Sequence, residues 1–301
     1  MTAASQLSPH AARRTGLPGP YGPIAALQVS ATAGSTCSST ALLVPGYTGS
    51  KEDFAPLLDR CAAAGFDTIA IDLPGQYESP GPHDPSAYLP LELGEVVAGL
   101  VERLAGDDNP VLLLGHSYGG LVARGAVLAG ARVAGLTLLA SGPAKLPDGP
   151  RKQALELGDG VLRDGDIADA YQVRESVSAR NPGWAALPVA LKEFLRTRFV
   201  ASSPAGLLGM GEGLRTEPDR VDALIAALDA NRTPRLVIAG ANDDAWPVAE
   251  QRDMARRLDA EFDLVPAAAH SPNTEHPDAL LDALLPRWRS WLDIQSASHI
   301  P

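Results

Sequence analysis

The residue of this sequence best suited to nucleophilic chemistry is Ser117, in the pentapeptide GHSYG of residues 115–119. The pentapeptide fits the pattern G-x-S-x-G, in which a serine stands on a sharp turn between a strand and a helix. An apolar segment precedes it at 111–114, and a segment of helical character follows it. Gly115 and Gly119 lack the Cβ atoms that so sharp a turn would bring into collision. The pattern therefore predicts a nucleophilic serine at the end of a strand.

A serine hydroxyl becomes a nucleophile only when a base accepts its proton, and histidine is the usual base. His270 is the best-placed histidine, because it lies in a loop after the last predicted strand. His276 is a weaker candidate, since it directly precedes Pro277, which is typical of the first residue of a helix. We therefore expect His270 to be the base.

The base in turn needs a carboxylate that orients it. Asp243 and Asp244 follow the predicted strand at 235–239, where such a carboxylate is expected. The strand at 136–140 is followed by Ser-Gly-Pro and offers no carboxylate. Position alone leaves both aspartates open, because one can orient His270 while the other caps the next helix.

The elements that would position these residues are short apolar segments alternating with segments of helical periodicity. Continuous apolar strands that alternate with helices indicate a parallel sheet covered on both faces, an α/β fold. The predicted strands are 41–44, 68–73, 111–114, 136–140, 235–239 and 262–265, with 24–29 as an antiparallel edge strand. The predicted helices are 53–64, 91–104, 118–128, 219–228, 247–258 and 277–288.

One connection is much longer than a single crossover helix requires. About 95 residues separate the strands at 136–140 and 235–239, where about 30 suffice for a crossover unit. We predict a helical insertion at 143–215 that covers the substrate, because it leaves the sheet at the edge where parallel sheets bind ligands. The expected organisation is a flexible N-terminal tail at 1–20, a core of 21–142 and 216–294, and this insertion.

The motifs together resemble the α/β-hydrolase superfamily, in particular its esterase-like and lipase-like serine hydrolases. The chain order Ser117, Asp243, His270 is that of the superfamily. The matching segments are VPGY at 44–47, DLPG with a serine at 72–79, GxxDxxxP at 240–247 and HxPxxExP at 270–277. The spacing of the third segment selects Asp243 as the acid.

The resemblance implies an α/β-hydrolase fold, with a helical cap inserted after the sixth strand. It also implies an oxyanion hole formed by the backbone amides of Tyr47 and Tyr118. The chain departs from the family pattern at Pro45, where a histidine is usual, and at 76–78, where the usual turn is centred on glycine. Both departures lie at the expected rim of the site.

These residues predict a serine hydrolase that needs no cofactor and no metal, and that cleaves a carboxylic ester or thioester of a small or medium-sized organic acid. The same triad would also suit a carbon–carbon bond hydrolase, an acyltransferase, or a haloperoxidase-like perhydrolase. A purely binding protein is disfavoured, because all three triad residues are present. A metal site made of His270, Glu275 and His276 is disfavoured too, since these residues lack an established ligand spacing.

Composition limits the partners. The chain has 301 residues with a formal net charge of −11, which repels nucleic acids and anionic membranes and favours a small-molecule substrate. No segment is apolar and long enough to span a membrane, and the first twenty residues lack the apolar run of a signal peptide, so we expect a cytoplasmic protein. The sequence does not predict the oligomeric state. It also leaves open a bridge between Cys37 and Cys61.

Overall fold

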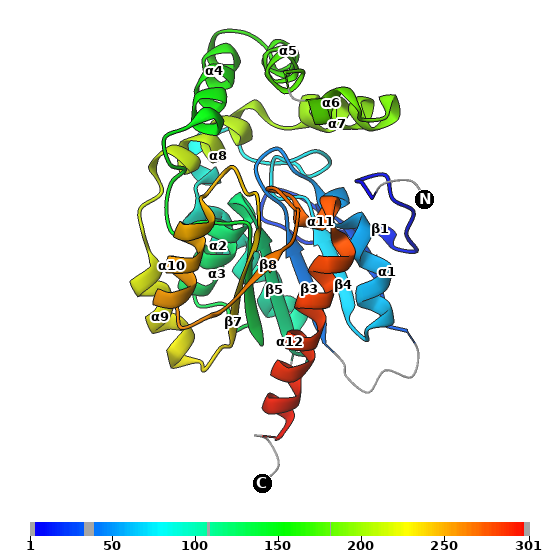
Figure 1. Cartoon of the computed structure of the whole chain (residues 1–301), viewed down its shortest axis with the longest axis vertical. Helices are drawn as coiled ribbons and strands as arrows, with labels where there is room; N and C mark the ends of the chain where they lie inside the picture. Colours follow the sequence, from blue (N-terminus) through cyan, green and yellow to red (C-terminus); the bar gives the residue numbers. More distant parts are fainter. Residues whose placement is uncertain (1–3, 33–38, 107–108, 181, 298–301) are drawn as a thin grey trace.

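The computed structural model describes residues 4–32, 39–106, 109–180 and 182–297. These residues form an eight-stranded sheet in the order β1-β2-β4-β3-β5-β6-β7-β8 (Figure 1). The strands are β1 (Arg13–Leu17), β2 (Ile24–Val29), β3 (Thr40–Val44), β4 (Asp67–Ile71), β5 (Val111–His116), β6 (Gly135–Leu139), β7 (Arg235–Gly240) and β8 (Glu261–Val265). From β4 to β8 all neighbours are parallel, whereas β2 is antiparallel to both β1 and β4. The predicted α/β fold is therefore confirmed.

Helices cover both faces of the sheet, as the apolar strands require (Figure 1). On one face lie α1 (Ala55–Ala63) and α12 (Pro277–Ala297). On the other lie α2 (Pro90–Ala105), α3 (Tyr118–Leu128), α9 (Val221–Ala230) and α10 (Val248–Arg257). Short helical turns are η1 (Lys51–Phe54), η2 (Pro85–Tyr88) and α11 (Pro272–Glu275).

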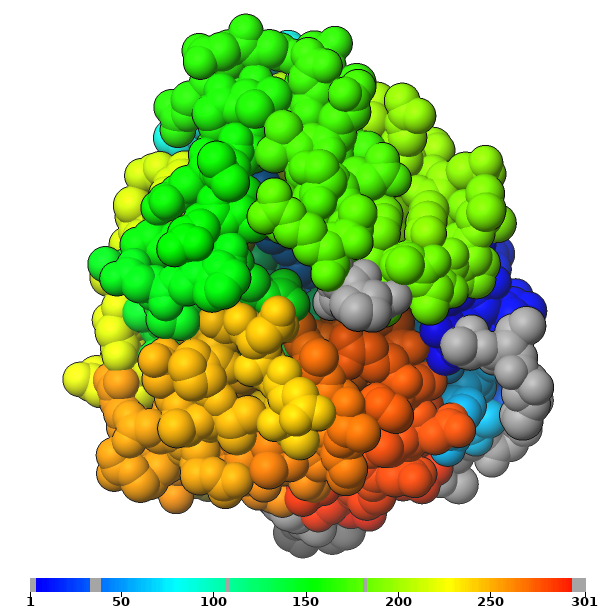
Figure 2. Space-filling view, turned by 45° about the horizontal axis from the view of Figure 1, so that its top comes forward, coloured from blue at the N-terminus to red at the C-terminus, as the bar shows by residue number. Residues whose placement is uncertain are grey.

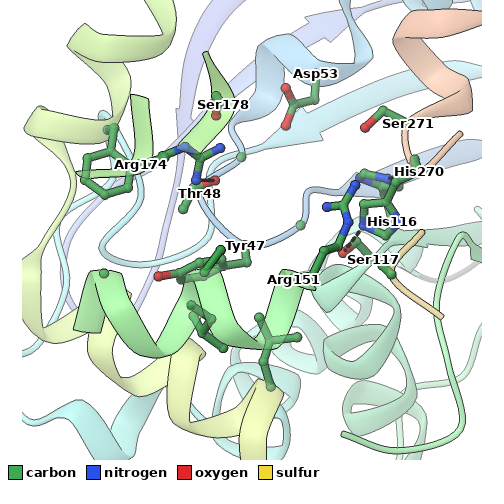
Figure 3. Close-up of a pocket in the computed structure, with 18 of the residues that line it drawn as sticks. Tyr47, Thr48, Asp53, His116, Ser117, Arg151, Arg174, Ser178, His270 and Ser271 are labelled. Atoms are coloured by element: carbon green, nitrogen blue, oxygen red, sulfur yellow. Dashed lines mark hydrogen bonds between the residues drawn. The ribbon is translucent and has the colours of Figure 1, made fainter. Parts of the chain in front are cut away.

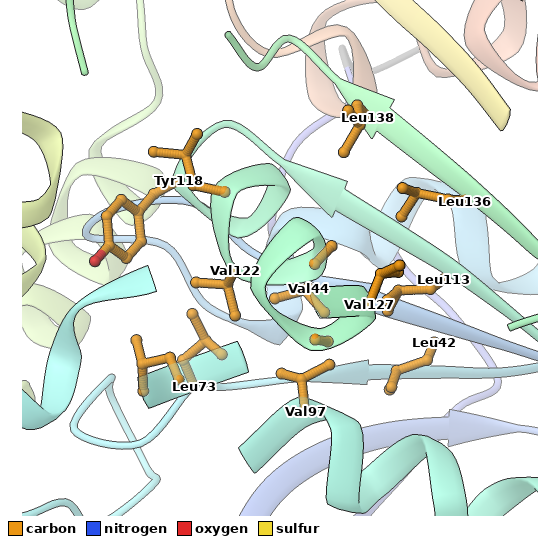
Figure 4. Close-up of a cluster of buried hydrophobic side chains, with 14 of the residues drawn as sticks. Leu42, Val44, Leu73, Val97, Leu113, Tyr118, Val122, Val127, Leu136 and Leu138 are labelled. Atoms are coloured by element: carbon orange, nitrogen blue, oxygen red, sulfur yellow. The ribbon is translucent and has the colours of Figure 1, made fainter. Parts of the chain in front are cut away.

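The central strands bury every residue because their side chains alternate between two cores. Leu42 and Leu113, paired across β3 and β5, point to the core shared with α2 and α3. Figure 4 shows this core, with Val97 and Val122 of the two helices facing the strands. Leu43 points instead to the core shared with α1 and α12. This double burial holds the carboxyl ends of the strands in fixed positions.

Between β6 and β7 the chain leaves the sheet and forms a helical insertion before returning through α9. The insertion contains α4 (Pro150–Asp164), α5 (Ile167–Ser178), α6 (Pro182–Ala185), α7 (Val189–Ala201) and α8 (Pro204–Thr216). Helices α4 to α7 lie at the top of the molecule, apart from the two helical layers of the sheet (Figure 1). Within the described ranges, no helix is both long and apolar enough to cross a membrane.

The N-terminal segment differs from the expected tail at 1–20. Arg13–Leu17 forms the edge strand β1, which pairs along its whole length with β2. Its residues are mostly exposed and carry no apolar alternation, because an edge strand can be held by backbone hydrogen bonds alone. The sheet domain therefore begins before residue 21. Helix α12 likewise runs through Pro286 to Ala297, beyond the predicted end at 288.

Of the two cysteines, Cys61 lies within the described residues. Cys61 is buried in α1 and faces the core shared with α12, and its burial raises the pKa of the thiol to about 12. Cys37 lies outside the described residues. The Cys37–Cys61 bridge that the sequence leaves open is therefore not tested by the described residues.

Candidate active site

The turn between β5 and α3 carries Ser117 in a backbone conformation that few non-glycine residues adopt. Its φ is 56° and its ψ is −121°. A Cβ atom on Gly115 would lie 2.1 Å from the carbonyl oxygen of Gly119, and one on Gly119 would lie 2.4 Å from that of Val44. Glycine is required at both positions, as expected. The turn lifts the Ser117 side chain off the end of β5, beside the first turn of a helix.

Two further side chains complete a chain of hydrogen bonds with Ser117. The Nε2 atom of His270 lies 2.9 Å from Ser117 Oγ (Figure 3). Its Nδ1 atom lies 2.9 Å from Asp243 Oδ1. His270 stands on the loop after β8, and Asp243 on the turn after β7. The structure thus brings Ser117 together with two residues that lie more than 100 positions further along the chain.

Two groups besides His270 donate hydrogen bonds to the Asp243 carboxylate. Oδ1 also accepts from the amide of Ala245, and Oδ2 accepts from Gln251 Nε2, both at 2.9 Å. Its side chain is fully buried. Burial alone would raise the pKa of Asp243, but the bond from His270 and these two further donors outweigh it and lower the pKa. Asp243 is therefore an anion that fixes the orientation of the His270 ring.

The sequence analysis did not identify Gln251. It lies on α10 in the polar segment VAEQRDMARR, where a glutamine normally faces solvent. In the structure Gln251 is fully buried and also donates to the backbone oxygen of Trp246. Gln251 stands three, four and seven positions before the buried residues Met254, Ala255 and Leu258, so the helical periodicity places it on the inner face of α10. The periodicity does not identify Asp243 as its partner.

The alternative residues for the acid and the base lie outside this chain of hydrogen bonds. Asp244 is exposed and forms an ion pair of 2.5 Å with Arg151 of the insertion. His276 is exposed at the start of α12. Glu275 accepts hydrogen bonds from the amides of Ala269 and Ser271, which flank His270. Glu275 therefore fixes the loop that carries His270. No group of three or more His, Cys, Asp or Glu in the described ranges is arranged to hold a metal ion.

The two expected oxyanion donors lie on either side of Ser117. The amide of Tyr118 begins α3, and that of Tyr47 follows Gly46, where an added Cβ would lie 2.9 Å from Ser117 Cβ. Among the described residues, neither amide donates to another group. Gln76 Nε2 donates to the Gly46 oxygen at 2.8 Å, so this departure from the family's turn fixes the loop beside the serine.

The side chains of the two tyrosines have different surroundings. The Tyr118 ring is fully buried, and its hydroxyl donates to the backbone oxygen of Tyr88 at 2.6 Å. The Tyr47 ring lines a cavity of about 330 Å³ above Ser117. The insertion also lines this cavity, with Leu155 of α4 and Phe199 of α7.

The cavity opens to solvent beside the insertion. Figure 2 shows a hollow framed by the green insertion above and the orange C-terminal segments below, with the blue N-terminal part of the chain at its floor. A cavity of this volume suits a ligand of small to medium size. Ser117 and His270 both line this cavity.

His116, next to the serine, is a buried histidine that lines the same cavity. Its Nε2 atom donates to the backbone oxygen of His270 at 2.8 Å, which leaves Nδ1 as an acceptor with no partner among the described residues. Burial, together with the proximity of His270, lowers the pKa of His116 to about 4. His116 is therefore neutral in the folded protein.

This shift predicts a stability that depends on pH. The unfolded chain protonates His116 at about pH 6.5, above the folded pKa, so the unfolded state gains the proton first. The free energy of unfolding should fall by about 1.4 kcal/mol per pH unit from about pH 6.5 to about pH 4 on this account. His116→Gln should remove that part of the slope in urea unfolding. Above pH 7 the two curves should run parallel, and parallel curves below pH 6 would refute the assignment.

Comparison with known proteins gives the class. Residues 41–283 match the alpha/beta hydrolase family. The chain belongs to this family, as its motifs predict. Among curated proteins, none matches the sequence significantly.

Solved structures with the same fold include several hydrolases. A thermophilic esterase from Thermogutta terrifontis, solved with malate bound, is 26% identical, with a TM-score of 0.69 over 93% of this chain and 99% of that one. An E-2-(acetamidomethylene)succinate hydrolase is 22% identical, with a TM-score of 0.64 over 91% and 97%. MenH from S. aureus is 18% identical, with a TM-score of 0.68 over 88% and 98%. At these identities, the last two show a likeness to this chain in fold alone.

Proposed function

We propose that this alpha/beta hydrolase cleaves carboxylic esters or thioesters of small or medium-sized organic acids, with Ser117, His270 and Asp243 as its catalytic triad. The observation that carries the proposal is the continuous chain of hydrogen bonds, 2.9 Å at each step, at the base of the cavity. The likeness to an esterase at 26% identity supports the choice of an ester bond.

The proposed reaction uses the same residues in both halves. His270 Nε2 takes the proton of Ser117 Oγ as the oxygen attacks the carbonyl carbon. The negative charge on the carbonyl oxygen is stabilised by the amides of Tyr47 and Tyr118. His270 then gives its proton to the departing alcohol or thiol. Water releases the acid from Ser117 by the same steps in reverse order, while Asp243 stabilises the imidazolium each time.

We propose the insertion at 143–215 as a cap that selects the substrate. Its support is the cavity wall, since Leu155 and Leu162 of α4 and Phe199 of α7 line the same cavity as Ser117. These apolar side chains would enclose the carbon skeleton and exclude water from the reacting bond. The cytoplasmic location stays a prediction of the sequence.

A direct test offers the protein 4-nitrophenyl esters and acyl thioesters with chains of increasing length. We expect release of the free acid and the alcohol or thiol in equal amounts, with faster turnover for chains that fit the cavity. Mass spectrometry of the products separates hydrolysis from transfer to an added alcohol. Absence of turnover for every ester and thioester would refute the proposal and favour carbon–carbon cleavage as the next activity to assay.

A further inference from the structure

The cavity above Ser117 is lined by more positive than negative charge. Among the described residues, its charged lining consists of Arg151, Arg174, Arg198 and Asp53, besides the histidines of the site. Arg198 pairs with Asp53 at 2.6 Å, which ties α7 to η1. Arg151 pairs with Asp244. Two of the three arginines therefore have carboxylate partners.

Arg174, on α5 of the insertion, has none in the described parts of the chain. Its Nη1 atom donates to Thr48 Oγ1 at 2.8 Å, and its guanidinium lies 5.5 Å from the ring centre of Phe199. Solvent in the cavity reaches the side chain. Burial within the insertion nevertheless lowers the pKa of Arg174, and the nearby cation of Arg198 lowers it further. The group stays protonated at neutral pH, because the ordinary value is so high.

The Arg174 charge lies in the same cavity as the reacting atoms, across from them. Thr48, which accepts the hydrogen bond from Arg174, directly follows Tyr47, whose amide is the proposed oxyanion donor. Figure 3 shows Arg174 beside Thr48 on one side of the cavity, with Ser117 and His270 on the other. A small molecule with its carbonyl at Ser117 would therefore extend toward Arg174.

The positive charge in the cavity is opposite in sign to the net charge of the chain. The whole chain has a net charge of −11, so its long-range field repels anions. An arginine kept without a counter-ion in such a chain attracts a negative group locally. A guanidinium forms two parallel hydrogen bonds with a planar carboxylate, and only one donor atom of Arg174 is used by Thr48.

We propose that the substrate carries a free carboxylate, which Arg174 binds while the ester or thioester carbonyl lies at Ser117. The substrate class is then a small ester with a second, unesterified acid group, such as the half-ester of a short dicarboxylic acid. The carbon skeleton between the two groups would contact Phe199 and Leu155. This inference rests on the proposed function and adds its specificity.

Binding of free dicarboxylates tests the inference without catalysis. Succinate, glutarate and adipate are titrated into the protein by calorimetry, beside the corresponding neutral diamides. We expect at least one dicarboxylate to bind about tenfold or more tightly than its diamide. Arg174→Gln should abolish that difference and Arg174→Lys should retain part of it. The control Arg163→Gln, an exposed arginine of α4, should bind as the wild type does.

Kinetics give the second readout. We expect kcat/KM for 4-nitrophenyl half-esters of the same acids to exceed that for uncharged acyl esters of equal length, with the excess lost in Arg174→Gln. If uncharged esters are hydrolysed but no dicarboxylate binds better than its diamide, the carboxylate inference is wrong and the proposed function stands. If dicarboxylates bind through Arg174 but no ester is hydrolysed, the proposed reaction is wrong and the anion site stands.

Discussion

Ser117→Ala should lower kcat for a small ester about a million-fold, the loss typical of removing a triad nucleophile. The hydroxyl is the atom that attacks, and His270 Nε2 faces it at 2.9 Å. The alanine variant should fold normally, because the strained φ of 56° already accommodates a Cβ atom. Steady-state kinetics on the best ester, with thermal unfolding measured on the same samples, check both statements.

The matched control is Ser176→Ala, which removes an exposed hydroxyl of α5 that bonds only within its own helix. We expect its kcat to equal that of the wild type. Ester hydrolysis by Ser117→Ala within about tenfold of the wild-type rate would show that another group performs the attack.

Asp243→Asn should lower kcat about ten-thousand-fold, as removal of the orienting carboxylate does in other serine hydrolases. The asparagine amide would donate to His270 Nδ1, so Nδ1 could no longer carry the proton. Nε2 would then carry it and could not accept the proton of Ser117. Gln251 Nε2 would still donate to the remaining oxygen of the side chain. The amide nitrogen in the place of Oδ1 could no longer accept from the Ala245 amide, so some loss of stability should accompany the larger loss in kcat.

Asp244→Asn is the matched control, one residue away. Its carboxylate is exposed and pairs with Arg151 at the mouth of the cavity, so we expect kcat to stay close to the wild-type value. Equal losses in the two variants would contradict the assignment of Asp243 as the acid, and a larger loss for Asp244→Asn would reverse it.

The fold could be predicted from sequence where several successive residues share one environment, or where neighbouring residues constrain one another. The strands β3, β5 and β6 are buried on both faces, which leaves an uninterrupted apolar segment in the sequence. The turn at Ser117 forces glycine at 115 and 119 by direct backbone contact, so its pattern is readable locally. Gly240 is also required, since a Cβ there would lie 1.8 Å from the Ala269 oxygen. This contact is tertiary, so the sequence shows only the motif and not its cause.

The parts that sequence did not predict depend on tertiary contacts of single polar residues. The helical periodicity can place Gln251 on the buried face of α10 beside Met254 and Ala255, but it gives no partner for the amide. Arg174 stands on α5 among other polar residues, where a solvent-facing side chain has the same appearance. Only the folded chain brings Gln251 under Asp243 and Arg174 beside Thr48. Strand β1 was placed in a tail for a related reason, because its pairing with β2 uses the backbone and requires no apolar side chains.

The central claim is that Ser117, activated by His270 and Asp243, is the nucleophile of this hydrolase. Its most direct measurement is reaction of the folded protein with a fluorophosphonate, followed by peptide mass spectrometry to locate the adduct. The account predicts one equivalent of adduct on Ser117, with labelling strongly slowed in His270→Ala. An adduct on another residue, or no adduct in a folded and otherwise intact protein, would contradict it.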